Sequence, residues 1–550
     1  MTTRSGMLTL PRTDRLGRSL VWLSSAALAA QLLLVVGLLL LLCREGLGCF
    51  WPDQIVELRL ADGSRVVGTI EQREPIVDHA RGKVVTGERV QVRVGNRDFF
   101  GLDFRWIDAA SITATHAHEE LVLLERREYG NFYGRVLALR RGDEVVAEGE
   151  AAAWQALRAE LPRAQARQRD LEALERGPLG DLNRELERLR LAARAAELET
   201  TDPARLAERQ RVLAQERAAV ERRHSVLGDQ LRTLREDQAS VQVLIEAADT
   251  QRKMLPIGQI VHAWRPNTFS FLDQAGLYCA RLWEFVSAEP RESNTEGGIF
   301  PAIFGTVLMV FLMTFVVTPF GVLAALYLRE YARQGLVVRI VRIAVNNLAG
   351  VPSIVFGVFG LGFFVYGIGG TIDRWFFPAA LPTATFGTGG ILWAALTLAL
   401  LTVPVVIVAT EEGLAAVPRI AREGSLALGA TKFETVWRVV IPAAAPGILT
   451  GVILAIARAA GEVAPLMIVG MVKHAPIPLD GRPPFLHLEG KFMHLGFHIY
   501  DVGFQSPNIE ATKPLVYATA LLLVLIVTVM NLGAISIRNH LRHKYATSAV

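Results

Sequence analysis

Two long stretches without a charged residue dominate this sequence. Leu20 to Cys43 and Gly297 to Leu328 contain no Asp, Glu, Lys or Arg, whereas the residues between them are rich in arginine and glutamate. Each stretch exceeds the roughly 20 apolar helical residues that cross a bilayer core of about 30 Å. With 550 residues, 20% of them charged, and a mean hydropathy of +0.31, the chain is predicted to be a membrane protein with a large water-exposed insert. An ordinary soluble enzyme is excluded.

Six transmembrane helices are predicted from the apolar runs. The first covers 20–43, and it is longer than the apolar region of about 7–15 residues that is typical of a cleaved signal peptide. The other five are expected at Phe300–Leu328, Ile343–Tyr366, Ile391–Thr410, Ala443–Gly470 and Leu515–Ile537.

Basic residues gather on one side of these helices. They precede the first helix and follow the second, fourth and sixth: Arg4, Arg12, Arg15, Arg18; Arg329, Arg333, Arg339, Arg342; Arg419, Arg422, Lys432, Arg438; Arg538, Arg542, Lys544. The positive-inside rule makes that side cytoplasmic. The tails 1–19 and 538–550 are therefore expected in the cytoplasm and residues 44–298 outside it. The net charge of +4 indicates topology rather than nucleic-acid binding.

The predicted insert has three parts. Residues 44–147 alternate apolar and polar positions between turn signals, which predicts a β-rich region. Residues 148–252 are rich in Ala, Arg, Glu and Leu, and a heptad repeat runs from Leu206 to Val241. Asp202 is a suitable N-cap and Pro203 a suitable first helical residue, so two helices meeting there predict an antiparallel coiled-coil hairpin. Residues 253–298 are expected to be a linker with an amphipathic helix at the membrane surface.

The sequence alone does not decide the role of the insert. The hairpin fits a spacer or a docking arm for an outward partner. Pro162 and Gly177-Pro178 are expected to interrupt its first helix. Cys49 and Cys279 fit either a disulfide or free buried thiols, and no cysteine–histidine cluster has the spacing of a metal site.

The predicted cytoplasmic loop 411–442 carries the most informative pattern. Gly429 stands where a helix ends in a left-handed residue. Thr431 and Glu434 form a T-x-x-E capping box that begins a new helix. A helix–glycine–helix element at the membrane surface is suited to fill a groove on another protein.

The spacing of Glu423, Gly429 and Pro442 resembles the EAA loop of ABC importer permeases, with Gly424, Ser425 and Ile441 as mild departures. Three further segments, Asn294–Ile303, Val345–Gly357 and Ala455–Leu466, are similar to the PstA-type permeases of phosphate importers. The resemblance implies the type I ABC importer permease class. The resemblance therefore predicts that the chain is an all-α polytopic membrane protein with six transmembrane helices and a permease core at 299–537. The insert between helices 1 and 2 is not explained by it.

The resemblance also implies partners. A PstC-type permease would complete a heterodimer, and a PstB-type ATPase dimer would bind the 411–442 loop through Glu423, Gly429, Thr431, Glu434 and Pro442. A periplasmic binding protein would deliver inorganic phosphate across a bacterial inner membrane. The chain has no G-x-x-x-x-G-K-[ST] motif, so ATP and Mg²⁺ are expected on the ATPase and no cofactor, metal or catalytic residue on this chain.

Two groups of residues are candidates for the phosphate path. Arg458 and Glu462 lie four residues apart in the fifth predicted span, where a charge costs about 2.5–3.5 kcal/mol and must face protein or water. They form either an anion site or a structural ion pair. Asn346, Asn347 and Ser353 either line the path or bond between helices. A permease for sulfate or molybdate and, less favoured, a membrane-anchored sensor or scaffold are the alternatives.

Overall fold

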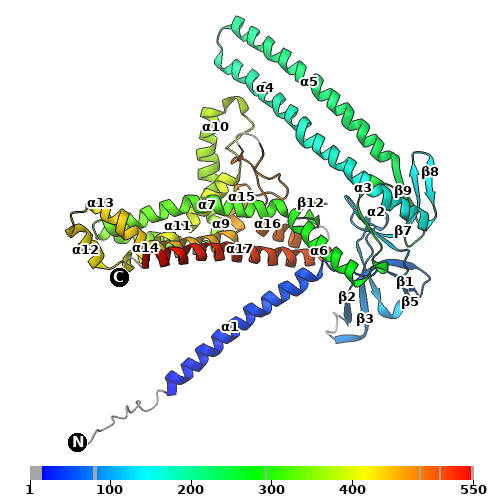
Figure 1. Ribbon diagram of the computed structural model, residues 1–550, viewed down its shortest axis with the longest axis horizontal. Helices are drawn as coiled ribbons and strands as arrows, with labels where there is room; N and C mark the ends of the chain where they lie inside the picture. Colours follow the sequence, from blue (N-terminus) through cyan, green and yellow to red (C-terminus); the bar gives the residue numbers. More distant parts are fainter. Residues whose placement is uncertain (1–14, 79–82, 292–293, 482–484, 507–508, 547–550) are drawn as a thin grey trace, which may run out of the picture.

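The computed structural model describes residues 15–78, 83–291, 294–481, 485–506 and 509–546. A bundle of long helices forms one part of the molecule, and a β-rich unit with a projecting helical hairpin forms the other (Figure 1). The predicted cytoplasmic tails fall partly outside the described residues, which include neither Arg4 nor Arg12.

Six helices in the described part of the chain are long and apolar enough to cross a membrane. They cover Leu20–Gly48, Phe300–Tyr331, Ser353–Phe376, Ile391–Ala416, Lys432–Ala460 and Thr512–Arg542. Their main elements are α1 (Arg15–Gly48), α7 (Phe300–Leu326), α9 (Ser353–Phe359), α10 (Gly370–Phe376), α11 (Ile391–Ala416), α14 (Ile441–Ala460) and α17 (Ile509–Ala546).

The third span begins ten residues later than predicted, at Ser353 rather than Ile343. Residues 336–348 instead form a separate amphipathic helix, α8 (Leu336–Leu348). Pro352 explains the break, because a proline disfavours helical geometry at the residue before it. The predicted start of the third span at Ile343 is therefore wrong, because the apolar residues 343–348 belong to α8.

The fifth span was also misplaced. Its helix begins before Ala443, in α13 (Lys432–Thr435), continues through a π-helical turn at Val436–Val440, and ends at Ala460. A separate short helix, α15 (Ala464–Val469), follows. The predicted continuous helix to Gly470 is therefore wrong, and Glu462 lies beyond the helix that holds Arg458.

The centre of the bundle is packed from α7, α11 and α14. Met309 and Met313 of α7 and Leu398 of α11 belong to one buried apolar cluster together with Ala455 of α14. Glycine permits the closest approach of α11 and α14, because a Cβ atom on Gly447 would lie 2.5 Å from the Cα atom of Gly413. Small residues at helix contacts are typical of membrane bundles.

The β-rich unit contains two antiparallel sheets. One has the strand order β4-β3-β2-β1-β5, and the other has the order β10-β9-β7-β6-β11 with β8 paired to β7. The strands are β1 (Val56–Leu60), β2 (Arg65–Asp78), β3 (Lys83–Arg93), β4 (Phe104–Asp108), β5 (Ile112–His116), β6 (Val122–Arg126), β7 (Phe132–Arg141), β8 (Glu144–Glu148), β9 (Val241–Glu246), β10 (Arg252–Pro256) and β11 (Ile260–Trp264). A short helix, α2 (Arg97–Phe100), connects β3 and β4.

The helical hairpin is inserted into the second sheet rather than placed after it. α3 (Glu150–Leu174) packs on this sheet through Leu157 and Leu161. It continues through Pro162 and through a π-helical turn, η2 (Glu175–Leu179), into α4 (Gly180–Glu199), so the expected interruptions do not occur. After the turn at Asp202, α5 (Pro203–Ser240) returns beside α4. Leu182 and Leu189 pack against Val220 between them.

Two predicted boundaries in the insert are wrong. Val241, expected at a heptad position of the hairpin, is the first residue of β9 and is buried in the sheet. Strands β10 and β11 also complete that sheet, so the β-rich unit reaches Trp264 rather than ending at residue 147. The physical reason is that β9 and β11 pair with β7 and β6, which lie a hundred or more residues earlier in the chain, and β10 in turn pairs with β9.

Short elements join the insert to the bundle. α6 (Phe271–Ser287) leads through β12 (Pro290–Arg291) and β13 (Glu296–Gly297) to α7. Cys49 and Cys279 are both free and exposed, in contrast to the expectation of buried thiols. The remaining helices are α12 (Arg419–Ala427) and α16 (Leu495–Tyr500).

Candidate functional site

The helix–glycine–helix element lies at the end of the bundle that also carries the end of α17 (Figure 1). Gly429 has a φ of 89°, in the left-handed region. Thr431 is the N-cap of α13: its hydroxyl accepts from the Glu434 backbone N–H at 3.3 Å, and its own N–H donates to Glu434 Oε2 at 2.9 Å. The predicted left-handed turn and capping box are therefore confirmed.

Polar contacts attach this element to neighbouring helices. Arg422 Nη2 lies 3.0 Å from Glu330 Oε1, just after α7, and donates to the Leu414 carbonyl of α11 at 2.6 Å. The ammonium of Lys432 lies 4.9 Å from the centre of the Tyr331 ring. These contacts attach the element to α11 and to the segment that follows α7.

Four large apolar side chains of the element are exposed. Leu428 is 90% exposed and Ile420 is 82% exposed. Phe433 and Trp437 are also exposed, and their rings stack with centroids 6.2 Å apart. We call these four residues the coupling patch. Glu423 is exposed nearby, whereas Pro442 lies inside the helical run that begins at Lys432. Large exposed apolar side chains gathered on one element are typical of an interaction surface.

Arg458 lies in the last turn of α14, and Glu462 follows the end of that helix. The predicted placement of both residues on one helical face is therefore wrong. They are nevertheless close, because Nε of Arg458 lies 3.9 Å from Oε1 of Glu462. That Nε is buried and has no hydrogen-bond partner, while the Arg458 side chain as a whole is 35% exposed. The contact is loose and leaves the guanidinium able to bind an anion.

The other three predicted path residues lie in α8 and at the start of α9. Asn346 lines a cleft of about 240 Å³ between α8 and α11, together with Arg342 and Glu411. Asn347 is exposed, Ser353 begins α9, and neither lines that cleft. Sequence reasoning missed the ion pair in the cleft, where Arg342 Nε lies 3.1 Å from Glu411 Oε1. The sequence signal for this ion pair is the pair of acidic residues Glu411-Glu412 directly after the fourth predicted span.

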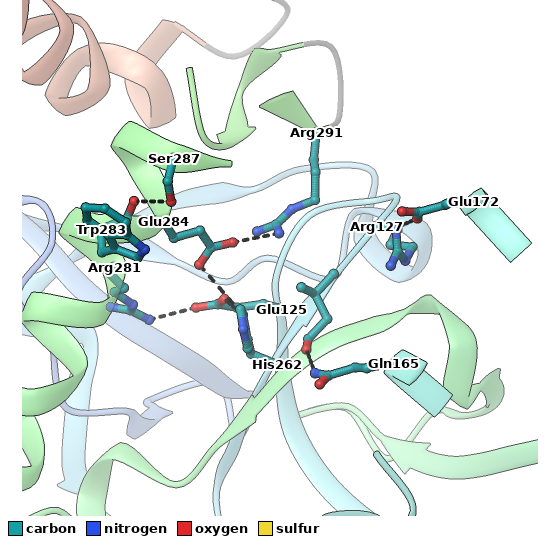
Figure 2. Close-up of polar contacts among 11 residues, drawn as sticks. Glu125, Arg127, Gln165, Glu172, His262, Arg281, Trp283, Glu284, Ser287 and Arg291 are labelled. Carbon is teal, nitrogen blue, oxygen red and sulfur yellow. Dashed lines mark hydrogen bonds and ion pairs between the residues drawn. The ribbon is translucent and has the colours of Figure 1, made fainter. Parts of the chain in front are cut away.

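An ionic junction joins the β-rich unit to α6 (Figure 2). His262 Nδ1 lies 2.9 Å from Glu125 Oε2, and Arg281 donates to Glu125 Oε1 at 2.8 Å. Arg291 donates to Glu284 Oε1 at 2.7 Å. The Glu125, His262 and Glu284 ligand atoms lie within 4.8 Å of one another, but the two arginines already neutralise both carboxylates, so the group is an ion-pair network rather than a cation site.

The network shifts the protonation of its members. Burial alone would raise the pKa of Glu125, but the His262 hydrogen bond and the Arg281 charge outweigh it and lower the pKa to about 2. Burial alone would lower the pKa of His262, whereas the hydrogen bond and charge of Glu125, with the charge of Glu284, raise it overall. The junction therefore holds a charged glutamate and favours a charged histidine.

Comparison with known proteins decides the family. A family model described as "Binding-protein-dependent transport system inner membrane component" matches residues 317–546. "Phosphate transport system permease protein PstA 1" of Mycobacterium tuberculosis (strain CDC 1551 / Oshkosh) is 35% identical over 243 residues, which cover 44% of this chain and 71% of that protein. The chain belongs to this family, as a PstA-type permease.

Other relatives agree with that assignment. "Phosphate transport system permease protein PstA" of Pasteurella multocida (strain Pm70) is 31% identical over 260 residues, covering 47% of this permease and 82% of the relative. The "Probable ABC transporter permease protein YqgI" of Bacillus subtilis (strain 168) is 30% identical over 259 residues, covering 46% and 81% respectively. The chain is therefore an integral inner-membrane permease of an ABC importer with the type I fold, a transport subunit rather than an enzyme. The matched residues 317–546 do not include the insert.

Proposed function

We propose that this permease forms half of the translocation pore of an ATP-driven importer of inorganic phosphate. The observation that carries the proposal is its 35% identity to a phosphate transport permease over most of that protein's length. Arg458 supports it physically, because its one ion-pair partner among the described residues, Glu462, is 3.9 Å away, which leaves donors of the guanidinium for phosphate oxygens.

Arg458 would bind phosphate transiently. Its buried Nε lacks a hydrogen-bond partner, which makes an anion a favourable ligand at that place. Glu462 would compete for the same guanidinium and so limit how tightly phosphate is held. A transporter needs this balance, since a ligand that binds too tightly is not released. Asn346 would act later in the path, in the cleft beside the Arg342–Glu411 pair.

The coupling patch would bind a PstB-type ATPase dimer, which carries ATP and Mg²⁺. Its four exposed apolar side chains suit a hydrophobic groove on a protein partner. The Arg422 contacts with Glu330 and Leu414 would transmit ATPase movement to α7 and α11. Glu423, Gly429, Thr431, Glu434 and Pro442 are proposed to shape this docking element.

The basic loops support a topology with both termini in the cytoplasm and the insert in the periplasm. A PstC-type permease would complete the heterodimer, and a periplasmic phosphate-binding protein would dock on the outward side. α6 would lie at the membrane surface, in contact with lipid, because Phe271, Leu272 and Trp283 are largely exposed while Leu277 and Phe285 are buried.

One experiment tests the proposal. The permease is reconstituted in liposomes with its partner permease, ATPase and binding protein, and uptake of phosphate, sulfate and molybdate is compared. We expect ATP-dependent uptake of phosphate alone. Uptake of sulfate or molybdate without phosphate would refute the substrate, and equal uptake without ATP would refute the coupling.

A further inference from the structure

The base of the hairpin contacts the linker through which the insert leads into the second span. Arg176, in the π-helical turn between α3 and α4, donates two hydrogen bonds to Glu289, at 2.7 Å to Oε1 and 2.6 Å to Oε2. Glu289 follows α6 and stands shortly before α7. The Arg176 hydrogen bonds lower the pKa of Glu289, so the carboxylate stays charged. This bidentate pair fixes the base of the hairpin beside the start of the second span.

A second contact lies further along the hairpin. The backbone of α4 runs against η8 (Pro378–Ala380), the turn that follows α10, between the third and fourth spans (Figure 1). Ala379 and Ala380 are only half-buried, and their small side chains allow the helix to approach closely. Hairpin and core therefore meet through residues almost 200 positions apart in the chain.

The segment that follows α15 lies between α10 and β12 in the view of Figure 1. It forms an open cleft of about 420 Å³ whose lining includes His474, His487 and Lys491. Asn294, between β12 and β13, donates to the Lys473 carbonyl at 2.7 Å, which places this segment near the first contact. The hairpin thus crosses the face of the bundle at which the second, third, fourth and fifth spans have their outward connections.

We propose that the insert is a strap that ties the start of the second span to the turn between the third and fourth spans, and so restrains the outward mouth of the permease. The outward direction rests on the proposed function. Alternating access moves these segments relative to one another. Because the hairpin contacts both segments, it stabilises the conformation of the permease in which both contacts are made relative to conformations in which one is broken.

The size of the effect follows from the exposure of the contacts. The Arg176 and Glu289 side chains are 67% and 48% exposed. The pair therefore shifts the equilibrium between the arrangement with both contacts and arrangements without them by roughly 1.5- to 5-fold. The α4–η8 contact adds to this. Removing both contacts therefore changes the equilibrium more than removing the ion pair alone.

The test uses the complete reconstituted transporter. Arg176→Glu and Glu289→Arg break the first contact, and the double exchange restores it with reversed charges. A third variant replaces residues 183–225 by a short Gly/Ser loop, which removes the α4–η8 contact and keeps the sheet with α3 and β9. The control is Arg217→Glu, because Arg217 forms its ion pair within α5, with Glu221 at 2.7 Å.

Two quantities are measured without binding protein. We expect the rate of ATP hydrolysis to rise about 1.5- to 5-fold in each single variant, to rise further in the shortened variant, and to return in the double exchange. Spin labels at Phe376→Cys, which is 73% exposed and lies outside η8, and at Phe300→Cys are expected to show a broader distance distribution in the shortened variant; the three native cysteines are replaced by serine. Arg217→Glu should change neither quantity.

An unchanged hydrolysis rate and distance distribution in the shortened variant would overturn the proposal. A double exchange that fails to restore the single variants would also count against it. These outcomes are separable from failure of the proposed function, because the distances do not depend on the transported anion. A transporter that imports sulfate instead of phosphate would still show the strap.

Discussion

Replacement of Gly429 provides the most direct test of the helix–glycine–helix element that we propose binds the ATPase. We call it the coupling element. Its φ of 89° is a conformation that side chains with a Cβ atom adopt only at a cost. A Cβ atom at this position would meet no other atom within 4 Å, so a substitution introduces no clash. Any effect of Gly429→Val therefore reports backbone conformation alone.

The expected magnitude follows from that geometry. A left-handed conformation costs an L-residue about 1–2 kcal/mol, with a β-branched side chain at the upper end. If docking requires the turn as it stands, the affinity of the ATPase falls by about 5- to 30-fold. Gly429→Ala is expected at the lower end of that range.

Gly424→Ala is the matched control. Gly424 lies within α12, and a Cβ atom there also meets nothing within 4 Å. Alanine stabilises a helix relative to glycine by about 0.5–1 kcal/mol, so this variant should bind the ATPase at least as well as the unchanged protein. The same substitution at two glycines five residues apart thus has opposite expected signs.

The assay is a dissociation constant for the ATPase subunit, measured with the heterodimer in nanodiscs at fixed salt. Folding is checked by thermal unfolding of the same samples. Equal affinities for Gly429→Val and Gly424→Ala, with both proteins folded, would refute the argument that the left-handed turn shapes the docking surface.

Three further predictions concern the patch, the path and the junction. Leu428→Asp should weaken ATPase binding by about 10- to 150-fold, which corresponds to the free energy of burying one leucine side chain. Val226→Asp, on the exposed hairpin, should leave ATPase binding unchanged. Equal ATPase binding by both variants would contradict the proposal that the coupling patch binds the ATPase. Arg458→Ala should reduce phosphate uptake by about 10- to 150-fold while the complex still assembles, and loss of assembly would instead favour a structural ion pair. Because the pKa of His262 is raised in the folded state, its stabilising contribution is complete below an unfolded pKa of about 6.5 and is lost as pH rises through the folded value. The unfolding temperature should therefore fall as the pH rises from about 6.5 through the raised folded-state pKa of His262, and it should fall less in His262→Gln than in the control His224→Gln. The same fall in both variants would count against the junction.

Local patterns predicted the coupling element well. The capping box of Thr431 and Glu434 involves residues three apart, and the left-handed Gly429 lies at the end of the preceding helix. Such features depend on neighbouring residues, so a sequence window contains the information. The candidate path was predicted less well, because Glu462 lies past the end of α14 and Asn346 lines a cleft to which Arg458 does not contribute.

The sequence by itself determined the apolar helices, the Asp202 cap of the hairpin and the glycine turn of the coupling element, since each follows from short-range periodicity or capping. Only the tertiary structure decided where the insert ends and what it touches. Strands β9 and β11 pair with β7 and β6 across the whole hairpin, and Arg176 meets Glu289 across 113 residues. These contacts form because folding brings distant surfaces together, and no local pattern in the chain specifies which surfaces meet.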